Sequence, residues 1–280
     1  MAHNVGRNFW SKGFQVHYEG YWGLEAPPFE NVPDPRYYFP SAKHEEALHR
    51  LLYGVEARKG AIMLTGEIGC GKTLLSRALI LHLSKNKYDI ALVADPSIGV
   101  DELLRELLYQ LGIEGAGSKV ELLHRLNGRL LENLKKGIDS VLIIDEAQAI
   151  KEEQVFEELR LLLNFQLNDR FLLTLVLMGQ PELRERVLAI KQLAQRVAIR
   201  YHLVPFGSEE SAQYVQARLK RAGCEKDLFT KYALLRIYQL SGGIARNINT
   251  LCDLCLLLGY MEKVERIDVA VVERAAQDLS

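Results

Sequence analysis

The residues most suited to chemistry lie in one short segment, Gly66-Glu67-Ile68-Gly69-Cys70-Gly71-Lys72-Thr73, which matches the pattern G-x-x-x-x-G-K-[ST]. Glycines let the backbone turn so that successive N–H groups face one concavity, and a helix beginning at Lys72 adds its positive dipole end. A triphosphate fits such a nest, with Lys72 reaching the β- and γ-phosphates and the Thr73 hydroxyl ligating Mg²⁺. The segment, with Leu74 after it, therefore predicts a binding site for the phosphates of ATP.

Two acidic residues form the second chemical pattern. Asp145 and Glu146 directly follow four apolar residues, Val141 to Ile144, which predict a buried strand. The carboxyl end of such a strand meets the ligand crevice. Asp145 would hold Mg²⁺ there, directly or through water, and Glu146 would orient and deprotonate the attacking water. A solvated helix start is the alternative for this pair. A kinase needs no water-activating Glu, so the pair favours hydrolysis.

A polar side chain follows the next apolar strand. Gln180 comes after Leu172–Met178 and precedes Pro181. In a parallel sheet it should emerge beside Asp145, where its amide could hold water or the γ-phosphate. A helix-capping role before Pro181 is the alternative.

Three arginines are further candidates. Arg196 ends a short helix before the last strand, Arg200 lies within that strand, and Arg246 stands one turn into a helix that follows Gly242-Gly243. By sequence alone, each is equally compatible with a solvated or salt-bridged surface position.

Alternating strand and helix patterns must position these residues. Strands separated by helices imply parallel pairing with right-handed crossovers, hence an α/β core. Strands are expected over residues 61–65, 90–95, 141–145, 172–178 and 199–204, and helices over 72–84, 100–111, 119–136 and 152–163. After Pro205-Phe206-Gly207 only helical patterns follow, over about 208–222, 228–240, 244–258 and 269–279. The fold class is therefore a P-loop core with a five-stranded parallel sheet and a small all-α lid.

The chain divides into four expected parts. Residues 1–20 lack periodicity and predict a mobile tail. Residues 21–60 comprise an aromatic, Pro-rich strap (Tyr21–Tyr38), which should wrap over a larger body without regular helix, and a helix capped by Ser41. Residues 61–206 form the core and 207–280 the lid.

The composition excludes several classes of protein. Lys and Arg number 35 against 36 Asp and Glu, which is not the basic excess of a histone-like protein. The longest nearly apolar run, Phe171 to Met178, is far shorter than the roughly 20 residues of a membrane span, and no signal peptide pattern opens the chain. We expect a cytoplasmic protein without direct membrane insertion. Cys252 and Cys255 fall on a helical apolar pattern and predict buried packing rather than a zinc site.

Several motifs together carry a family resemblance. The order of phosphate loop, Asp-Glu strand end, polar residue after the next strand, Arg before the last strand and Gly-Gly-x-x-Arg in a helical lid is similar to AAA+ ATPases. More narrowly, the sequence resembles ExeA/GspA-type secretion ATPases, with related modules in TnsC-like transposition ATPases. The matching segments are Tyr21-Trp22-Gly23-Leu24, Pro28-Phe29, Pro33-Asp34-Pro35-Arg36, residues 66–73, Gly179-Gln180-Pro181-Glu182-Leu183 and Ser241-Gly242-Gly243-Ile244-Ala245-Arg246.

This resemblance implies roles for individual residues. Gln180 would be the first sensor of the γ-phosphate and Arg246 the second, from the lid. Arg196 would be a finger that enters the site of a neighbouring subunit, which implies self-association into a ring or filament. Phe29 and Tyr38 of the strap would cover the adenine, and His44 would lie near the base. 

Together, the motifs and the resemblance predict Mg²⁺-dependent ATP hydrolysis. We expect it to be coupled to the assembly or remodelling of a protein complex, as in envelope secretion. One alternative is a DNA-transaction ATPase that assembles on duplex DNA, although residues 208–280 balance ten Lys and Arg against ten Asp and Glu. Another is a binding switch with slow hydrolysis.

Overall fold

The computed structural model describes residues 18–279. The tail expected over residues 1–20 lies outside the described residues except for 18–20, where the expectation is wrong. The short helix α1 (Glu19–Trp22) begins there, and Tyr18 just before it is buried against the C-terminal helices.

Five parallel strands form one sheet in the order β2-β3-β4-β1-β5, so the expected architecture is confirmed. The strands are β1 (Ala61–Gly66), β2 (Tyr88–Val93), β3 (Asp139–Ile144), β4 (Leu173–Gly179) and β5 (Val197–Leu203). Thr65 of β1 lies opposite Gly179 of β4, and Gly66 lies opposite Leu203 of β5. The carboxyl ends of these strands therefore meet at one edge, as in other open α/β sheets.

Helices cover both faces of the sheet. One layer consists of α2 (Ala42–Glu56) and α3 (Lys72–His82), and the other of α4 (Val100–Gln110), α5 (Lys119–Lys136), α6 (Glu153–Leu162), α7 (Pro181–Ala189) and α8 (Lys191–Arg196). Because alternate strand residues point to opposite faces, Ile62 and Leu64 pack under α2 and α3, while Ala61 and Met63 belong to the core on the other side. The central strands β1 and β4 are thus buried on both faces, whereas the edge strand β5 carries Arg200 and His202.

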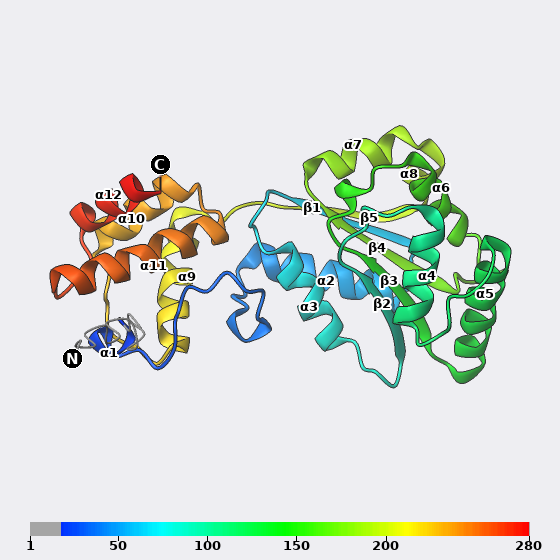
Figure 1. The fold of residues 1–280 in the computed structure, drawn as a ribbon, viewed down its shortest axis with the longest axis horizontal. Helices are drawn as coiled ribbons and strands as arrows, with labels where there is room; N and C mark the ends of the chain where they lie inside the picture. Colours follow the sequence, from blue (N-terminus) through cyan, green and yellow to red (C-terminus); the bar gives the residue numbers. More distant parts are fainter. Residues whose placement is uncertain (1–17, 280) are drawn as a thin grey trace, which may run out of the picture.

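The lid is a separate helical lobe beside the α/β lobe (Figure 1). It contains α9 (Ser208–Arg221), α10 (Lys231–Ser241), α11 (Ala245–Glu262) and α12 (Val269–Asp278). Its own core includes Cys252 and Cys255, both fully buried as free thiols, as the helical pattern predicted. Burial raises the pKa of Cys255 to about 12, so this side chain stays a neutral packing group.

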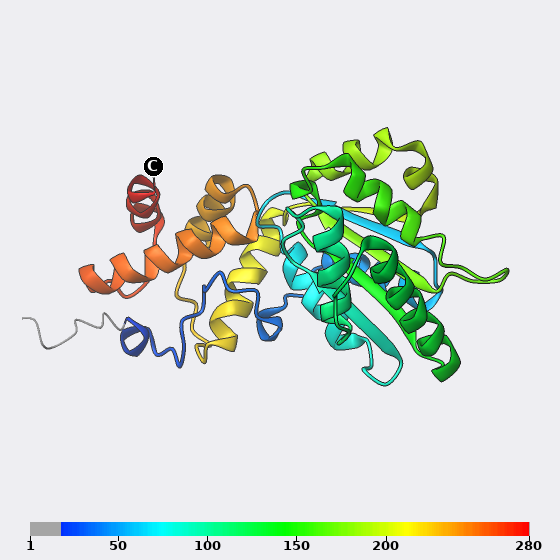
Figure 2. The ribbon, with the colours of Figure 1, turned by 45° about the vertical axis from the view of Figure 1, so that its right-hand side comes forward.

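The strap packs on the lid, and Figures 1 and 2 show it running beside α9 before the chain enters α2. Trp22, Leu24 and Phe29 belong to the core of the lid. The indole Nε1 of Trp22 donates to the carbonyl of Leu256 at 2.9 Å. The larger body that the strap covers is therefore the lid, while α2 lies on the sheet.

Two predictions of local structure are corrected. The strap holds a 3-10 turn, η1 (Pro35–Tyr37), because Pro35 occupies the first position, where no donor is needed, and Asp34 accepts the N–H of Arg36. Helix α10 begins at Lys231 rather than near 228, because Phe229 forms a bridge with Ile267 and the Thr230 side chain caps the helix.

Candidate functional site

A cleft of about 200 Å³ lies where the phosphate loop (residues 66–73), the strap and the lid meet. Its lining residues are Glu30, Asn31, Val32, Pro33, Ile68, Gly69, Gly71, Lys72, Thr73, Leu74, Glu146, Tyr214, Arg218, Ala245, Arg246 and Asn249. Residues from both ends of the chain and from the middle of the core therefore share one site.

The phosphate loop has the backbone that its sequence predicts. Gly69 and Gly71 have φ values of 81° and 98°, in the left-handed region that favours glycine. Gly71 caps the N-terminus of α3, so the first free N–H groups of that helix belong to the loop. The helix dipole and these amides favour an anion at this point.

The Lys72 ammonium is held inside the loop. Its Nζ donates to the carbonyls of Gly66 and Glu67 at 2.8 and 2.9 Å, and the residue is 4 % exposed. Burial lowers the pKa of Lys72, while the nearby carboxylates of Glu146 and Asp145 oppose that shift. A positive charge thus lies among the loop amides, where phosphates would be neutralised.

Thr73 and Asp145 meet directly across the site. The Thr73 side chain hydrogen-bonds to the Asp145 carboxylate, which also accepts the N–H of Glu146 at 2.9 Å. Burial raises the pKa of Asp145, and these two hydrogen bonds oppose the shift. A hydroxyl and a carboxylate side by side provide oxygen ligands of the kind that Mg²⁺ prefers. The residues present therefore fit a bound Mg²⁺ ion.

Glu146 lines the cleft with an unusual backbone. Its φ of 49° is in the left-handed region, which is uncommon for a residue with a side chain. Its carboxylate accepts from Nε2 of Gln148 at 2.5 Å, and the Gln148 Oε1 accepts the N–H of Gln180 at 3.0 Å. Sequence reasoning missed Gln148, because its only signal is a place in the 3-10 turn η2 (Ala147–Ala149) that follows the acidic pair.

Gln180 lies at the N-terminal end of α7, without a side-chain capping bond. Its main chain contacts Gln148, and strand β4 beneath it lies between β3 and β1. The structure therefore brings Gln180 to the same sheet edge as Asp145, joined to Glu146 through Gln148.

The lid contacts the phosphate loop directly. The main-chain N–H of Arg246 donates to the Gly69 carbonyl at 3.2 Å, and Arg246 lines the cleft. Next to this contact, the Phe206 N–H donates to the Gly243 carbonyl at 3.0 Å. Because Gly243 lies tightly against the Phe206 backbone and has a φ of 74°, no side chain fits at that position.

The lid and α3 both hold the strap against the cleft. Arg218 of α9 donates to the carbonyls of Pro28 and Glu30, with its guanidinium 4.2 Å from the Tyr37 ring centroid. From the core side, Arg77 of α3 donates to the Pro33 carbonyl at 2.8 Å. Strap residues 30–33 are thus a fixed wall of the site.

None of the three residues expected near the adenine lines the cleft. Phe29 is 2 % exposed in the lid core, with its ring against Phe229, and does not line the cleft. Tyr38 packs against the core layer of α2 and α3. His44 lies behind the phosphate loop, where its Nε2 is 2.9 Å from the Cys70 carbonyl and its Nδ1 is 2.8 Å from Oγ of Ser41. Of these strap residues, Phe29 thus packs in the lid core and Tyr38 packs against the α/β lobe.

Arg196 lies at the opposite edge of the sheet from the phosphate loop. Val197 pairs with Ala61 at the start of β1, whereas the phosphate loop begins at Gly66, about 16 Å further along the strand at 3.3 Å per residue. Its guanidinium lies 5.8 Å from the Phe171 ring and donates to Gln166 and Asn164. Arg196 therefore cannot reach the cleft of its own chain. Arg200 donates to the Ala194 carbonyl and is also outside the cleft.

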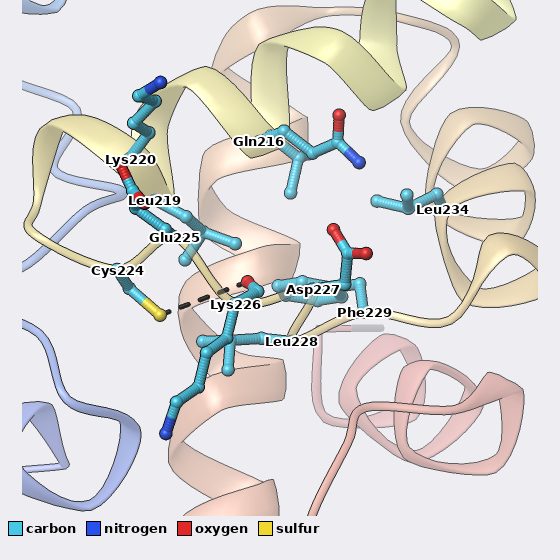
Figure 3. A pocket seen from close by; sticks show the side chains of 11 residues that line it. Gln216, Leu219, Lys220, Cys224, Glu225, Lys226, Asp227, Leu228, Phe229 and Leu234 are labelled. Atoms are coloured by element: carbon cyan, nitrogen blue, oxygen red, sulfur yellow. Dashed lines mark hydrogen bonds between the residues drawn. The ribbon is translucent and has the colours of Figure 1, made fainter.

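A second cavity, of about 270 Å³, lies in the lid (Figure 3). Gln216, Asp227 and Phe229 line it, and the Cys224 thiol donates to the Lys226 carbonyl. None of its lining residues belongs to the phosphate loop or the acidic pair. Within residues 18–279, no group of three or more His, Cys, Asp or Glu side chains could hold a metal ion, and no helix has the length and apolar character of a membrane span.

The chain is similar to known proteins in both sequence and fold. A family model described as an AAA domain matches residues 55–187. General secretion pathway protein A of Aeromonas hydrophila is 40% identical over 268 residues, which are 94% of this chain and 48% of that protein. The chain thus spans about half the length of this relative.

Solved structures share the fold at low identity. The ORC2 protein of Aeropyrum pernix, in ADPNP-ADP complexes, has a TM-score of 0.68 at 16% identity, covering 91% of this chain and 72% of that chain. Drosophila ORC bound to DNA has a TM-score of 0.71 at 16% identity, covering 100% and 70%. The RuvB Holliday junction branch migration motor of Thermotoga maritima has a TM-score of 0.56 at 20% identity, covering 84% and 69%.

These matches agree with the geometry of the cleft. The chain has a phosphate loop at the end of β1 and an acidic pair at the end of β3, which is separated from β1 by β4 alone. It also has a helical lid that contacts the loop. The expected resemblance to AAA+ ATPases of the secretion type is thus confirmed: residues 55–187 match an AAA domain, and 94% of the chain is similar to general secretion pathway protein A.

Proposed function

We propose that this protein binds ATP with Mg²⁺ and hydrolyses it. The observation that carries this proposal is the meeting of Lys72, Thr73 and Glu146 in one cleft, with Asp145 buried beside Thr73. A buried ammonium among loop amides suits the β- and γ-phosphates, and a carboxylate at the cleft suits proton abstraction from water.

Thr73 and Asp145 would hold the Mg²⁺ ion. When bound, such an ion neutralises charge on the phosphates. Glu146 would orient the attacking water and accept its proton, while Gln180 and Arg246 would contact the γ-phosphate from the sheet edge and from the lid. Strap residues 30–33 and the lid residues Tyr214 and Asn249 would enclose the rest of the nucleotide, because they line the remaining wall of the cleft.

Full activity would require a second copy of the chain. Arg196 lies next to the start of β1, and the phosphate loop begins at the other end of that strand, about 16 Å away at 3.3 Å per residue. A guanidinium in that place suits the nucleotide of a neighbouring subunit in a ring or filament. We propose that Arg196 is such a finger.

We propose assembly or remodelling of a protein complex as the use of this energy, since the relative with 40% identity is a general secretion pathway protein. The alternative is that ATP hydrolysis drives a reaction on duplex DNA. The structures that share the fold include an ORC bound to DNA and a Holliday junction branch migration motor. A binding switch with slow hydrolysis is the third candidate.

The test is ATP turnover measured against protein concentration, with and without duplex DNA, for the wild type and Glu146→Gln. Turnover per subunit should rise with concentration, and the variant should lose about 10²-fold or more while still binding ATP. Absence of turnover at every concentration, with DNA and with candidate protein partners, would remove the hydrolysis proposal. Stimulation by DNA alone would favour the DNA alternative. A Glu146→Gln variant that holds a partner tightly in ATP would favour the switch.

A further inference from the structure

The Gln148 side chain bridges two parts of the site that are far apart in the sequence. Its Nε2 donates to Oε2 of Glu146 at 2.5 Å, and its Oε1 accepts the N–H of Gln180 at 3.0 Å. Both ends of one amide are therefore engaged, one on the carboxylate of the acidic pair and the other on the main chain at the end of β4.

We infer that Gln148 is a positioning residue, which fixes the orientation of the Glu146 carboxylate relative to the end of β4. This inference rests on the proposed hydrolysis, in which Glu146 accepts a proton from water. A carboxylate that is held through one oxygen presents the other oxygen in one orientation. A catalytic base that is already correctly oriented before the reaction accelerates it much more than a base that must first be oriented.

The backbone that carries Gln148 is itself clamped. Nη1 of Arg186, on α7, donates to the carbonyl of Gln148 at 2.9 Å and also to the carbonyl of Ile150. The guanidinium lies 4.7 Å from the centroid of the Phe156 ring on α6. Helices α6 and α7 thus hold the turn after the acidic pair, so the main chain from which the Gln148 side chain extends is fixed.

Gly179 makes the contact with β4 sterically allowed. A Cβ placed at Gly179 would lie 2.5 Å from Oε1 of Gln148 and 2.9 Å from Cδ2 of Leu183. Any side chain at this position would displace the Gln148 amide from the Gln180 N–H. The end of β4 therefore accommodates the amide because residue 179 is glycine.

The backbone of Glu146 is strained at the position that Gln148 contacts. Its φ of 49° is in the left-handed region, which is unfavourable for a residue with a side chain. The backbone conformation sets the direction in which the Glu146 side chain leaves the turn. The hydrogen bond from Gln148 holds the carboxylate in that direction.

The experiment compares Gln148→Ala and Gln148→Glu with Gln154→Ala, an exposed glutamine of the neighbouring helix α6. Glu at 148 can accept the Gln180 N–H but cannot donate to Glu146. We expect both substitutions at 148 to lower kcat about ten- to a hundredfold, with an unchanged Kd for a non-hydrolysable ATP analogue. Gln154→Ala should match the wild type. Unchanged kcat in Gln148→Ala, or loss of analogue binding together with loss of folding, would overturn the inference.

A second readout does not depend on turnover. In a crystal structure of Gln148→Ala, the Glu146 carboxylate should leave the position that it has beside Gln148 or take more than one orientation. A carboxylate that stays in place would contradict the inference even if kcat fell. If the wild type shows no hydrolysis, the proposed function fails, and the crystal structure still decides the role of Gln148.

Discussion

The main-chain N–H of Arg246 donates to the carbonyl of Gly69 across 3.2 Å. This bond joins the first turn of the lid helix α11 to the middle of the phosphate loop. A change in the loop on nucleotide binding must therefore either keep this bond or move the lid. The contact therefore links the lid directly to the phosphate loop.

Gly69→Ala tests this link. A Cβ at Gly69 would lie 2.7 Å from Cβ of Arg246, and the φ of 81° disfavours alanine. We expect nucleotide affinity to fall by about tenfold or more, as the lid is displaced from the loop, in addition to about 1–2 kcal/mol of backbone strain. Calorimetric titration with an ATP analogue measures the affinity.

Gly112→Ala is the matched control for Gly69→Ala. Gly112 has a similar φ of 71°, but no atom lies within 4 Å of an added Cβ. It should lose stability from strain and keep its nucleotide affinity. Equal loss of affinity in both variants would show that strain, rather than the Arg246 contact, explains the effect.

Mixing two inactive variants tests whether Arg196 acts between subunits. Arg196→Ala retains the phosphate loop and Glu146, whereas Glu146→Gln retains the arginine. Each alone should be nearly inactive, since arginine fingers contribute about 10³–10⁵ in rate. A mixture should regain measurable ATP turnover, because one copy supplies the arginine and the other the complete cleft. A mixture as inactive as its components would contradict action in trans.

Phe29→Ala distinguishes a core residue from an adenine contact. Phe29 is 2 % exposed, and its ring lies against Phe229. We expect the free energy of unfolding to fall by about 3–5 kcal/mol, the usual cost of Phe→Ala in a core. Nucleotide affinity in the folded fraction should stay unchanged. Phe229→Ala should behave alike, whereas weaker nucleotide binding at full stability would restore Phe29 to the adenine site.

The pH dependence of stability should contain a contribution from His44. Burial lowers the pKa of His44 from its ordinary 6.5, although the hydrogen bond to Cys70 opposes the shift. Between that lower pKa and 6.5 the unfolded chain binds a proton that the folded protein does not. Stability from this residue is therefore complete above pH 6.5 and falls as the pH drops through that window.

Urea unfolding of the wild type, His44→Gln and His49→Gln from about pH 7.5 to about pH 5 measures this contribution, at about 1.4 kcal/mol for each unit of pKa shift. His49 is exposed on the same helix. The wild type and His49→Gln should lose stability more steeply toward acid than His44→Gln. Parallel curves for all three proteins would exclude His44 as the source.

Local patterns were sufficient for the sheet and for the phosphate loop. The central strands β1 and β4 are buried on both faces, so continuous apolar runs predicted them. Gly69, Gly71 and Lys72 follow a spacing that the backbone geometry of the loop requires. Asp145 and Glu146 were found because they end such a run. These features depend on residues close together in the sequence.

The remaining features depend on contacts between distant segments. An aromatic ring such as Phe29 can be buried either in the lid core or against a nucleotide base. The residues next to it in the sequence do not indicate which of the two partners it has. Gln148 carries no spacing signal, because its role depends on the main chain of Gln180, 32 residues away. His44 likewise faces the Cys70 carbonyl, which only the packing of α2 against the loop determines.

The placement of Trp22 and Phe29 inside the lid has a consequence for biosynthesis. The lid draws its core from the first described residues and from the last quarter of the chain, so the α/β lobe is inserted into it. During translation that lobe can fold as soon as β5 leaves the ribosome, since domains generally fold as units. Trp22 and Phe29 are synthesised before the α/β lobe. They stay exposed to solvent and to chaperones until α12 has been synthesised and the lid can fold.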